Sequence, residues 1–100
     1  MLQSKLEIPI EAIKLICQRY QVHELALFGS ALRDDFNANS DLDLLVEFEP
    51  KAQVGFITLS RMQRELSMVL HRPVDLVPKG GLKPKIRQTV LASAEVIYAA

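Results

Sequence analysis

The segment Asp41–Phe48, with the sequence DLDLLVEF, decides the fold of this chain. Apolar side chains make up one face of the segment: Leu42, Leu44, Val46 and Phe48. The opposite face carries Asp41, Asp43, Leu45 and Glu47. Because successive side chains of a β-strand point to opposite sides, this alternation predicts a strand with one face on an apolar core.

The residues before this strand predict a helix and a second strand. Pro9 suits the first turn of a helix, and apolar side chains then recur at helical spacing, which predicts a helix over 9–21. His23–Phe28 (HELALF) is short and apolar and is followed by Gly29, which favours a buried strand. Residues 31–35 fit a short helical turn.

The residues after it predict two more helices and at least one more strand. A long helix is expected over 55–71, and Val74–Val77 (VDLV) is expected to be a short strand. Residues 79–82 include two glycines and predict a mobile loop. A helix is expected from Pro84 to about Ser93, while Glu95–Tyr98 fits either a final strand or a continuation of that helix. We therefore expect a single α/β (α+β) domain over 1–100, a small mixed sheet with helices packed mainly on one face.

Composition narrows the function classes. The chain has 100 residues, 49% of them apolar, and its twelve basic and twelve acidic residues leave no net charge. This balance does not favour non-specific binding to membranes or to nucleic acid, and we expect no direct nucleic-acid binding. Neither a secretory signal nor a bilayer-spanning apolar run is evident, so a cytoplasmic location is expected. A core this small would gain stability from a homodimer or a permanent partner, and both remain open.

The local distribution of charge is less even than the total. Six acids fall within 34–49, and four bases fall within 79–87 with no acid among them. Such a separation suits a divalent metal at one place and an anion at another. Two unrelated solvated loops would explain it as well, and for the basic run alone that is the simpler explanation.

Asp41 and Asp43 are the first candidates for a chemical site. Two positions apart on a strand, their carboxylates leave the same face with roots about 6.6 Å apart. They repel each other unless a positive charge lies between them, and Mg²⁺ prefers hard oxygen ligands of this kind. A solvent-facing strand edge accounts for the pair equally well on this pattern alone.

Two further features of the sequence are candidates for the same site as Asp41 and Asp43. Gly29 and Ser30 follow a predicted strand, where glycine lets the backbone approach a phosphate and the serine hydroxyl can donate to it. Asp75 interrupts the apolar run VDLV, where a carboxylate needs a partner. It would serve as a shared metal ligand, as a base toward an acceptor hydroxyl, or as an ion-pair partner of Arg72 or another base.

The combination of these features resembles one protein family. The stretch FGSALRDDFNANSDLDLLVEFEP and the later PVDLV are similar to the minimal nucleotidyltransferases of the DNA polymerase β-like superfamily. Members commonly occur beside HEPN-domain proteins in toxin–antitoxin pairs. The resemblance implies that Gly29, Ser30 and Arg33 bind the nucleoside triphosphate. It also implies that Asp41, Asp43 and Asp75 bind Mg²⁺ and form the catalytic set.

The resemblance leaves two function classes to be compared. The first is an enzyme that moves AMP from ATP onto a HEPN-domain toxin and silences it. The second is an antitoxin that blocks its partner by occupancy with little catalysis. The complete set of acids and the Gly-Ser turn favour the enzyme. Many family members have glycine after the arginine, whereas this chain has Asp34, which bears on the role of Arg33.

Overall fold

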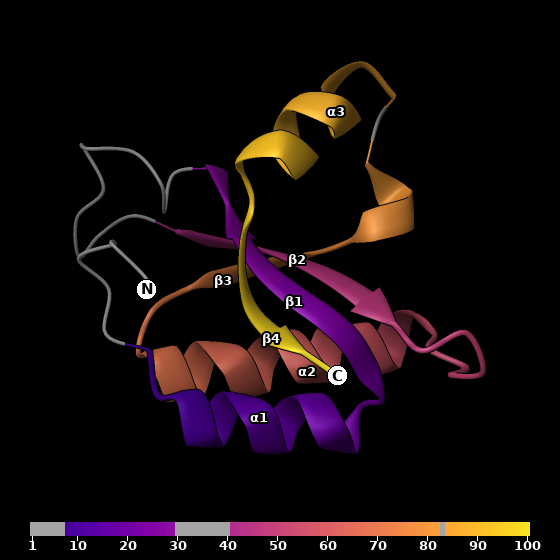
Figure 1. Cartoon of the computed structure of the whole chain (residues 1–100). Helices are drawn as coiled ribbons and strands as arrows, with labels where there is room; N and C mark the ends of the chain where they lie inside the picture. Colours follow the sequence, from indigo (N-terminus) through magenta and orange to yellow (C-terminus); the bar gives the residue numbers. More distant parts are fainter. Residues whose placement is uncertain (1–7, 30–40, 83) are drawn as a thin grey trace.

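The fold is taken from a computed structural model, which describes residues 8–29, 41–82 and 84–100. Four strands form one mixed sheet in the order β3-β2-β1-β4. Among the described residues, the helices α1, α2 and α3 and the short 3₁₀ helix η2 accompany it (Figure 1). The short helical turn expected at 31–35 lies outside the described residues.

The first helix and strand lie close to the predicted bounds. α1 spans Ile10–Arg19 and begins directly after Pro9. It buries Ile13, Ile16 and Cys17, the positions that helical spacing assigns to one face. β1 spans Val22–Phe28, so it starts one residue before the predicted bound.

The sheet centre is formed by β1 and β2, and β2 spans Leu42–Phe48. These two strands are antiparallel, and β4, which spans Glu95–Ala99, pairs antiparallel with the other edge of β1. The last segment is therefore a strand, which is one of the two structures that the sequence allowed.

The crossover from β2 to β3 carries the second helix. α2 spans Phe56–Leu70, and β3 spans Val74–Pro78 and runs parallel to β2. Parallel neighbours require such a crossover, and here it is a helix. α2 ends at His71, whose φ of 57° places its backbone in the left-handed conformation that terminates many helices.

The sheet is covered unequally on its two faces. α1 and α2 lie side by side on one face, where they enclose the larger core with side chains of β1, β2 and β3 (Figure 1). The predicted inward set of β2 is confirmed, since Leu42, Leu44 and Val46 are each at most 1% exposed in this core. α3, Pro84–Ser93, lies over the opposite face with a smaller cluster that includes Ala26, Leu45 and Leu82. Helices are thus packed mainly on one face, as expected.

The prediction of a loop at 79–82 was wrong. Lys79–Gly81 form the short 3₁₀ helix η2, and Leu82 is only 8% exposed in the smaller core. A long-range ion pair and a buried leucine order this segment, and neither was visible in its local Gly-Gly sequence. Within the described residues, none of the helices combines the length and apolar character needed to cross a bilayer.

Candidate active site

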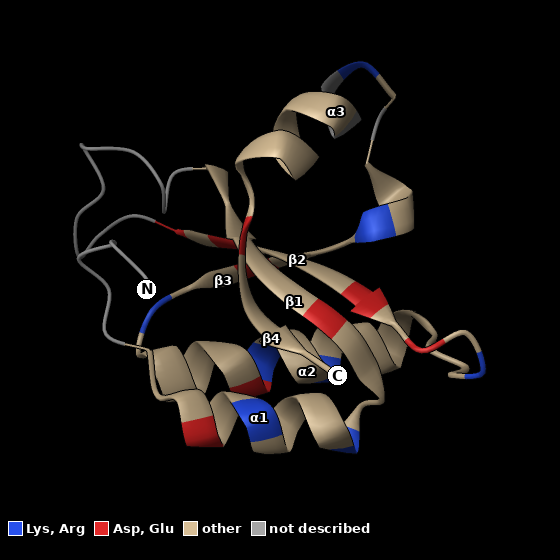
Figure 2. Ribbon diagram, viewed as in Figure 1, with Lys and Arg blue, Asp and Glu red and all other residues tan. Residues whose placement is uncertain are grey.

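The carboxylate of Asp43 leaves the sheet on the face opposite α1 and α2. Its neighbours Leu42 and Leu44 are both fully buried in the larger core, so the alternation of the strand sends Asp43 the other way. Asp41 directly precedes β2 and is exposed, and Asp43 is half-buried. Figure 2 shows the acidic colour at the start of β2.

Asp75 lies directly beside Asp43 in the sheet. The parallel register pairs these two residues with each other, and it pairs Leu42 with Val74 and Leu44 with Leu76. All four of these flanking residues belong to the larger core, which places both aspartates on the opposite face. Neighbouring strands are about 4.8 Å apart, so one ion can lie within reach of both side chains.

Gly29 completes this part of the site on the other flank of Asp43. It follows β1, whose last residue Phe28 pairs with Asp43. Its φ of 68° is a left-handed conformation that residues with a side chain rarely adopt. A Cβ atom added there would lie 3.2 Å from the Cγ of Asp43 and closer still to its carboxylate oxygen. The structure therefore explains the glycine by the carboxylate next to it.

Asp43 and Asp75 share one sheet face and Asp41 directly precedes β2, but the three do not form a closed cage. No group of three or more acidic, His or Cys side chains within the described ranges has the arrangement of a preformed metal site. Asp41 and Asp43 each already take part in a polar or electrostatic interaction. Carboxylates aimed at one place repel each other unless a cation lies between them, so a closed cage of the three is not expected without a metal ion.

The alternative that Asp75 is held by an ion pair with a base receives no support. The ion pairs that join Arg19 to Glu65, His23 to Glu49, and Lys79 to two glutamates all lie elsewhere. Asp75 is not part of this set, and its side chain is exposed. An exposed, accessible carboxylate beside Asp43 is what a metal or substrate would need. Ser30 and Arg33, the other residues singled out from the sequence, lie outside the described residues.

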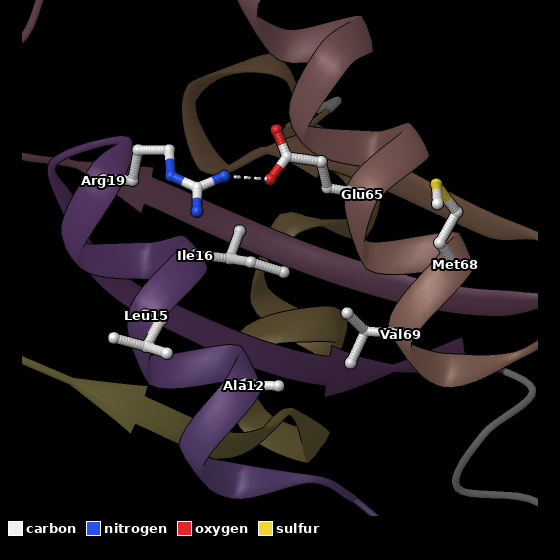
Figure 3. A pocket seen from close by; sticks show the side chains of 7 residues that line it. All are labelled: Ala12, Leu15, Ile16, Arg19, Glu65, Met68 and Val69. Atoms are coloured by element: carbon white, nitrogen blue, oxygen red, sulfur yellow. Dashed lines mark hydrogen bonds and ion pairs between the residues drawn. The ribbon is translucent and has the colours of Figure 1, made fainter.

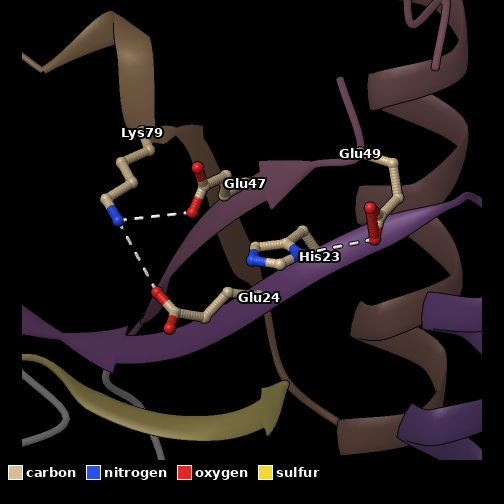
Figure 4. Close-up of polar contacts among 5 residues, drawn as sticks. All are labelled: His23, Glu24, Glu47, Glu49 and Lys79. Carbon is tan, nitrogen blue, oxygen red and sulfur yellow. Dashed lines mark hydrogen bonds and ion pairs between the residues drawn. The ribbon is translucent and has the colours of Figure 1, made fainter. Parts of the chain in front are cut away.

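The basic run contributes to structure at its first residue. The Nζ of Lys79 lies 3.3 Å from the Oε1 of Glu47 on β2 and 3.7 Å from the Oε1 of Glu24 on β1 (Figure 4). Nearby, the Nδ1 of His23 lies 3.3 Å from Glu49. Glu47 is four positions beyond Asp43 along β2, so this acidic group is distinct from the candidate site. Sequence reasoning missed it because its members come from three separate segments.

The helical layer carries a groove between α1 and α2. It has a volume of about 300 Å³ and is lined by Ala12, Leu15, Ile16, Arg19, Glu65, Met68 and Val69 of α1 and α2 (Figure 3). Arg19 and Glu65 close one end with an ion pair at 2.5 Å. The groove is largely apolar and lies on the layer that covers the other face of the sheet, so it is separate from the carboxylates.

Comparison with known proteins identifies the class. The family model of the nucleotidyltransferase domain matches residues 10–97, and the chain belongs to this family. It is an enzyme of the nucleotidyltransferase class, with the polymerase β-like fold.

The relatives place the chain among minimal nucleotidyltransferases. It is 40% identical over 86 residues to the protein adenylyltransferase MntA of Thermococcus cleftensis, a match that covers 85% of this chain and 82% of the relative. It is similar to the solved structure of a minimal nucleotidyltransferase, with a TM-score of 0.70, 35% identity and 85% of each chain covered.

A more distant likeness concerns the fold alone. The tri-AMPylated HEPN toxin of Shewanella oneidensis has been solved in complex with an MNT antitoxin. That structure gives a TM-score of 0.65 at 18% identity, covering 91% of this chain and 70% of the other.

Proposed function

We propose that this chain transfers AMP from ATP, with Mg²⁺, onto a HEPN-domain toxin, and that it acts as an antitoxin by this modification. One observation carries the proposal: the parallel register places Asp75 beside Asp43, next to the bend at Gly29. Gly29 at the end of β1, Asp43 on β2 and Asp75 on β3 are distant in sequence but lie close together. A glycine that lets a phosphate approach the backbone therefore lies beside two carboxylates.

The residues present fit a magnesium ion. Asp41, Asp43 and Asp75 offer hard oxygen donors from one sheet face, and Asp41 and Asp75 are exposed to an incoming ion. Asp41 and Asp43 would hold the ion. Asp75 would complete the metal site or accept the proton of the attacking hydroxyl. When bound, Mg²⁺ neutralises charge on the phosphate oxygens and so favours nucleophilic attack.

The nucleotide would lie at the end of β1. Gly29 has no side chain to keep a triphosphate away from the backbone, and a side chain there would collide with the carboxylate of Asp43. Ser30 and Arg33 would donate to phosphate oxygens, a role that rests on the family resemblance.

The reaction depends on how the acceptor hydroxyl and ATP are aligned, and it requires no nucleophilic side chain of the enzyme. A hydroxyl of the acceptor attacks the α-phosphorus of ATP, a new P–O bond forms, and the bond to the β-phosphate oxygen breaks. Pyrophosphate leaves, and the hydroxyl proton passes to Asp75 or to water. Because no covalent intermediate with the enzyme is required, the rate depends on alignment and on charge neutralisation.

The acceptor is proposed from the relatives. The similar archaeal protein is named a protein adenylyltransferase, and the distant solved complex contains an AMPylated HEPN toxin with an MNT antitoxin. Both point to a protein acceptor rather than a small molecule. They support a HEPN-domain protein encoded next to this chain as the substrate to be tested first.

The test is the intact mass of that neighbouring protein after incubation with this chain, Mg²⁺ and each triphosphate in turn. The expected result is the addition of one or more AMP groups with ATP, and a loss of at least about 100-fold in rate for Asp43→Asn. Glu47→Gln is the matched control, because Glu47 lies on the same strand and instead contacts Lys79. It should retain the rate of the unmodified protein.

Two results would contradict the proposal. If none of the triphosphates changed the mass of the neighbouring protein, this chain would not transfer a nucleotide to it. If Asp43→Asn neutralised the toxin as fully as the unmodified chain in a growth assay, neutralisation would be by occupancy and the modification would not be its cause.

A further inference from the structure

The exposed edge of the sheet at β3 is capped by two side chains of α2. β3 is an edge strand, and edge strands present unpaired backbone N–H groups. Here the N–H of Val74 donates to the Oγ of Ser67 at 3.1 Å, and the N–H of Leu76 donates to the Oε1 of Gln63 at 2.9 Å. Two backbone donors of the edge therefore find side-chain acceptors instead of a further strand.

The two acceptors are themselves fixed. Gln63 and Ser67 are four positions apart on α2, so they lie one above the other on the same side of the helix. The hydroxyl of Ser67 donates to the backbone carbonyl of Gln63 at 2.9 Å. The lone pairs of the hydroxyl oxygen therefore remain available to accept from the N–H of Val74. The carbonyl of Ser67 also accepts from the N–H of Arg72 at 3.2 Å, so the connection to β3 is tied to the same residue.

Asp75 is the residue between the two capped positions. On the other side of β3, the N–H of Leu42 donates to the carbonyl of Pro73 at 2.9 Å, and the ladder with β2 follows. β3 is thus held by β2 on one side and by α2 side chains on the other, at the two residues that flank Asp75. Register matters here, because a slip of one residue would send Asp75 to the opposite face.

We propose that Gln63 and Ser67 are positioning residues for Asp75: they fix the edge strand so that its carboxylate stays beside Asp43. This inference rests on the proposed role of Asp75 in the site. Neither residue reaches that face of the sheet, so they act only through the backbone of β3. Removing hydrogen bonds that hold a metal ligand in position commonly lowers metal affinity or activity by about 10- to 100-fold.

The test compares variants that delete an acceptor with variants that keep it. Ser67→Ala and Gln63→Met delete the acceptors, whereas Ser67→Thr and Gln63→Glu retain an oxygen at each place. Ser93→Ala is the matched control on α3, because the hydroxyl of Ser93 also donates to a carbonyl four residues earlier, at 3.1 Å, without contacting β3.

Three readouts separate positioning from stability. The first is Mn²⁺ affinity measured by electron paramagnetic resonance, with Mn²⁺ itself as the probe. The second is amide hydrogen exchange at Val74 and Leu76. The third is the separation of kcat from the KM for ATP in the transfer assay.

The expected result is about a tenfold loss of Mn²⁺ affinity and of kcat in the two deletion variants, with KM within twofold. Exchange at the two capped amides should accelerate, and the Thr and Glu variants should restore all three readouts. Ser93→Ala should change none of them. If Gln63→Met failed to fold, Ser67→Ala, which removes one oxygen atom, would carry the test.

Unchanged Mn²⁺ affinity and kcat, in the presence of faster exchange at the capped amides, would overturn the inference and leave the caps a purely structural role. Failure of the proposed function has a different signature. In that case the unmodified chain itself would bind no Mn²⁺ at the aspartates and transfer no nucleotide, and the inference would fall with it.

Discussion

Asp43 on β2 and Asp75 on β3 stand side by side in the sheet, although they are 32 positions apart in the chain. Each is flanked by core residues on the opposite face, so the packing of the core fixes the placement of both carboxylates. Two adjacent like charges are unfavourable unless a cation joins them. The arrangement supports the proposed site for a metal ion and a nucleotide.

The contact between Gly29 and Asp43 leads to the first prediction. Gly29→Ala places a methyl group against the carboxylate in a left-handed conformation, which should lower the unfolding free energy by about 1–2 kcal/mol. Because the carboxylate must shift, nucleotide transfer should fall by about 100-fold. Gly80→Ala is the control, since an added Cβ there meets no atom within 4 Å. Equal activity of the two variants would contradict the proposed role of this contact.

The ion pairs of Lys79 lead to the second prediction. Because Lys79 is occupied by Glu24 and Glu47, Lys79→Ala should leave the KM for ATP within twofold. Its effect on unfolding free energy should be no more than about 1 kcal/mol, as for other partly exposed pairs. Arg33→Ala is the comparison, and it should raise the KM. A comparable rise in KM for Lys79→Ala would show that the basic run binds the nucleotide after all.

The buried thiol of Cys17 gives a prediction about alkaline pH. Burial raises its pKa from the ordinary value of 9.0 to about 12. Between these values the unfolded chain has lost the thiol proton and the folded chain retains it, so the folded state loses stability as pH rises through this window. Burial and the hydrogen bond to Glu65 also raise the pKa of Tyr20, which acts in the same direction.

Comparison with Cys17→Ala isolates the contribution of the thiol. Urea unfolding on both sides of pH 9.0 should show a steeper loss of stability in the unmodified chain than in this variant. Iodoacetamide should modify Cys17 only under unfolding conditions. Identical pH dependence in the two proteins, or rapid alkylation of the folded chain, would argue against a fully buried thiol.

Much of the fold follows from local sequence patterns, and the exceptions have long-range causes. The alternation in 41–48 and the helical spacing after Pro9 and Gly55 gave elements within about two residues of those observed. Glu95–Ala99 became a strand because it pairs with β1, a partner far away in sequence. The segment 79–82 is not the expected loop because Lys79 forms an ion pair with Glu24 of β1. In addition, Leu82 packs in the smaller core with residues of β1 and β2.

The sequence indicates the residue types of the candidate site but not their geometry. The sequence alone predicts that Asp41 and Asp43 share a strand face, although the observed strand β2 begins at Leu42, one residue after Asp41. The pairing of Asp75 with Asp43 depends on strand order and register, which no local pattern specifies. The capping of β3 by Gln63 and Ser67 is likewise invisible in the sequence, because both residues fit an ordinary helix surface.

The most direct measurement is the anomalous scattering of Mn²⁺ in crystals of this chain grown with a non-hydrolysable ATP analogue. A single ion bound by oxygens of Asp41, Asp43 and Asp75, at about 2.1 Å, with the triphosphate beside Gly29, is the expected result. A metal peak at Glu24 and Glu47 instead, or a nucleotide bound with no metal near the three aspartates, would contradict the account.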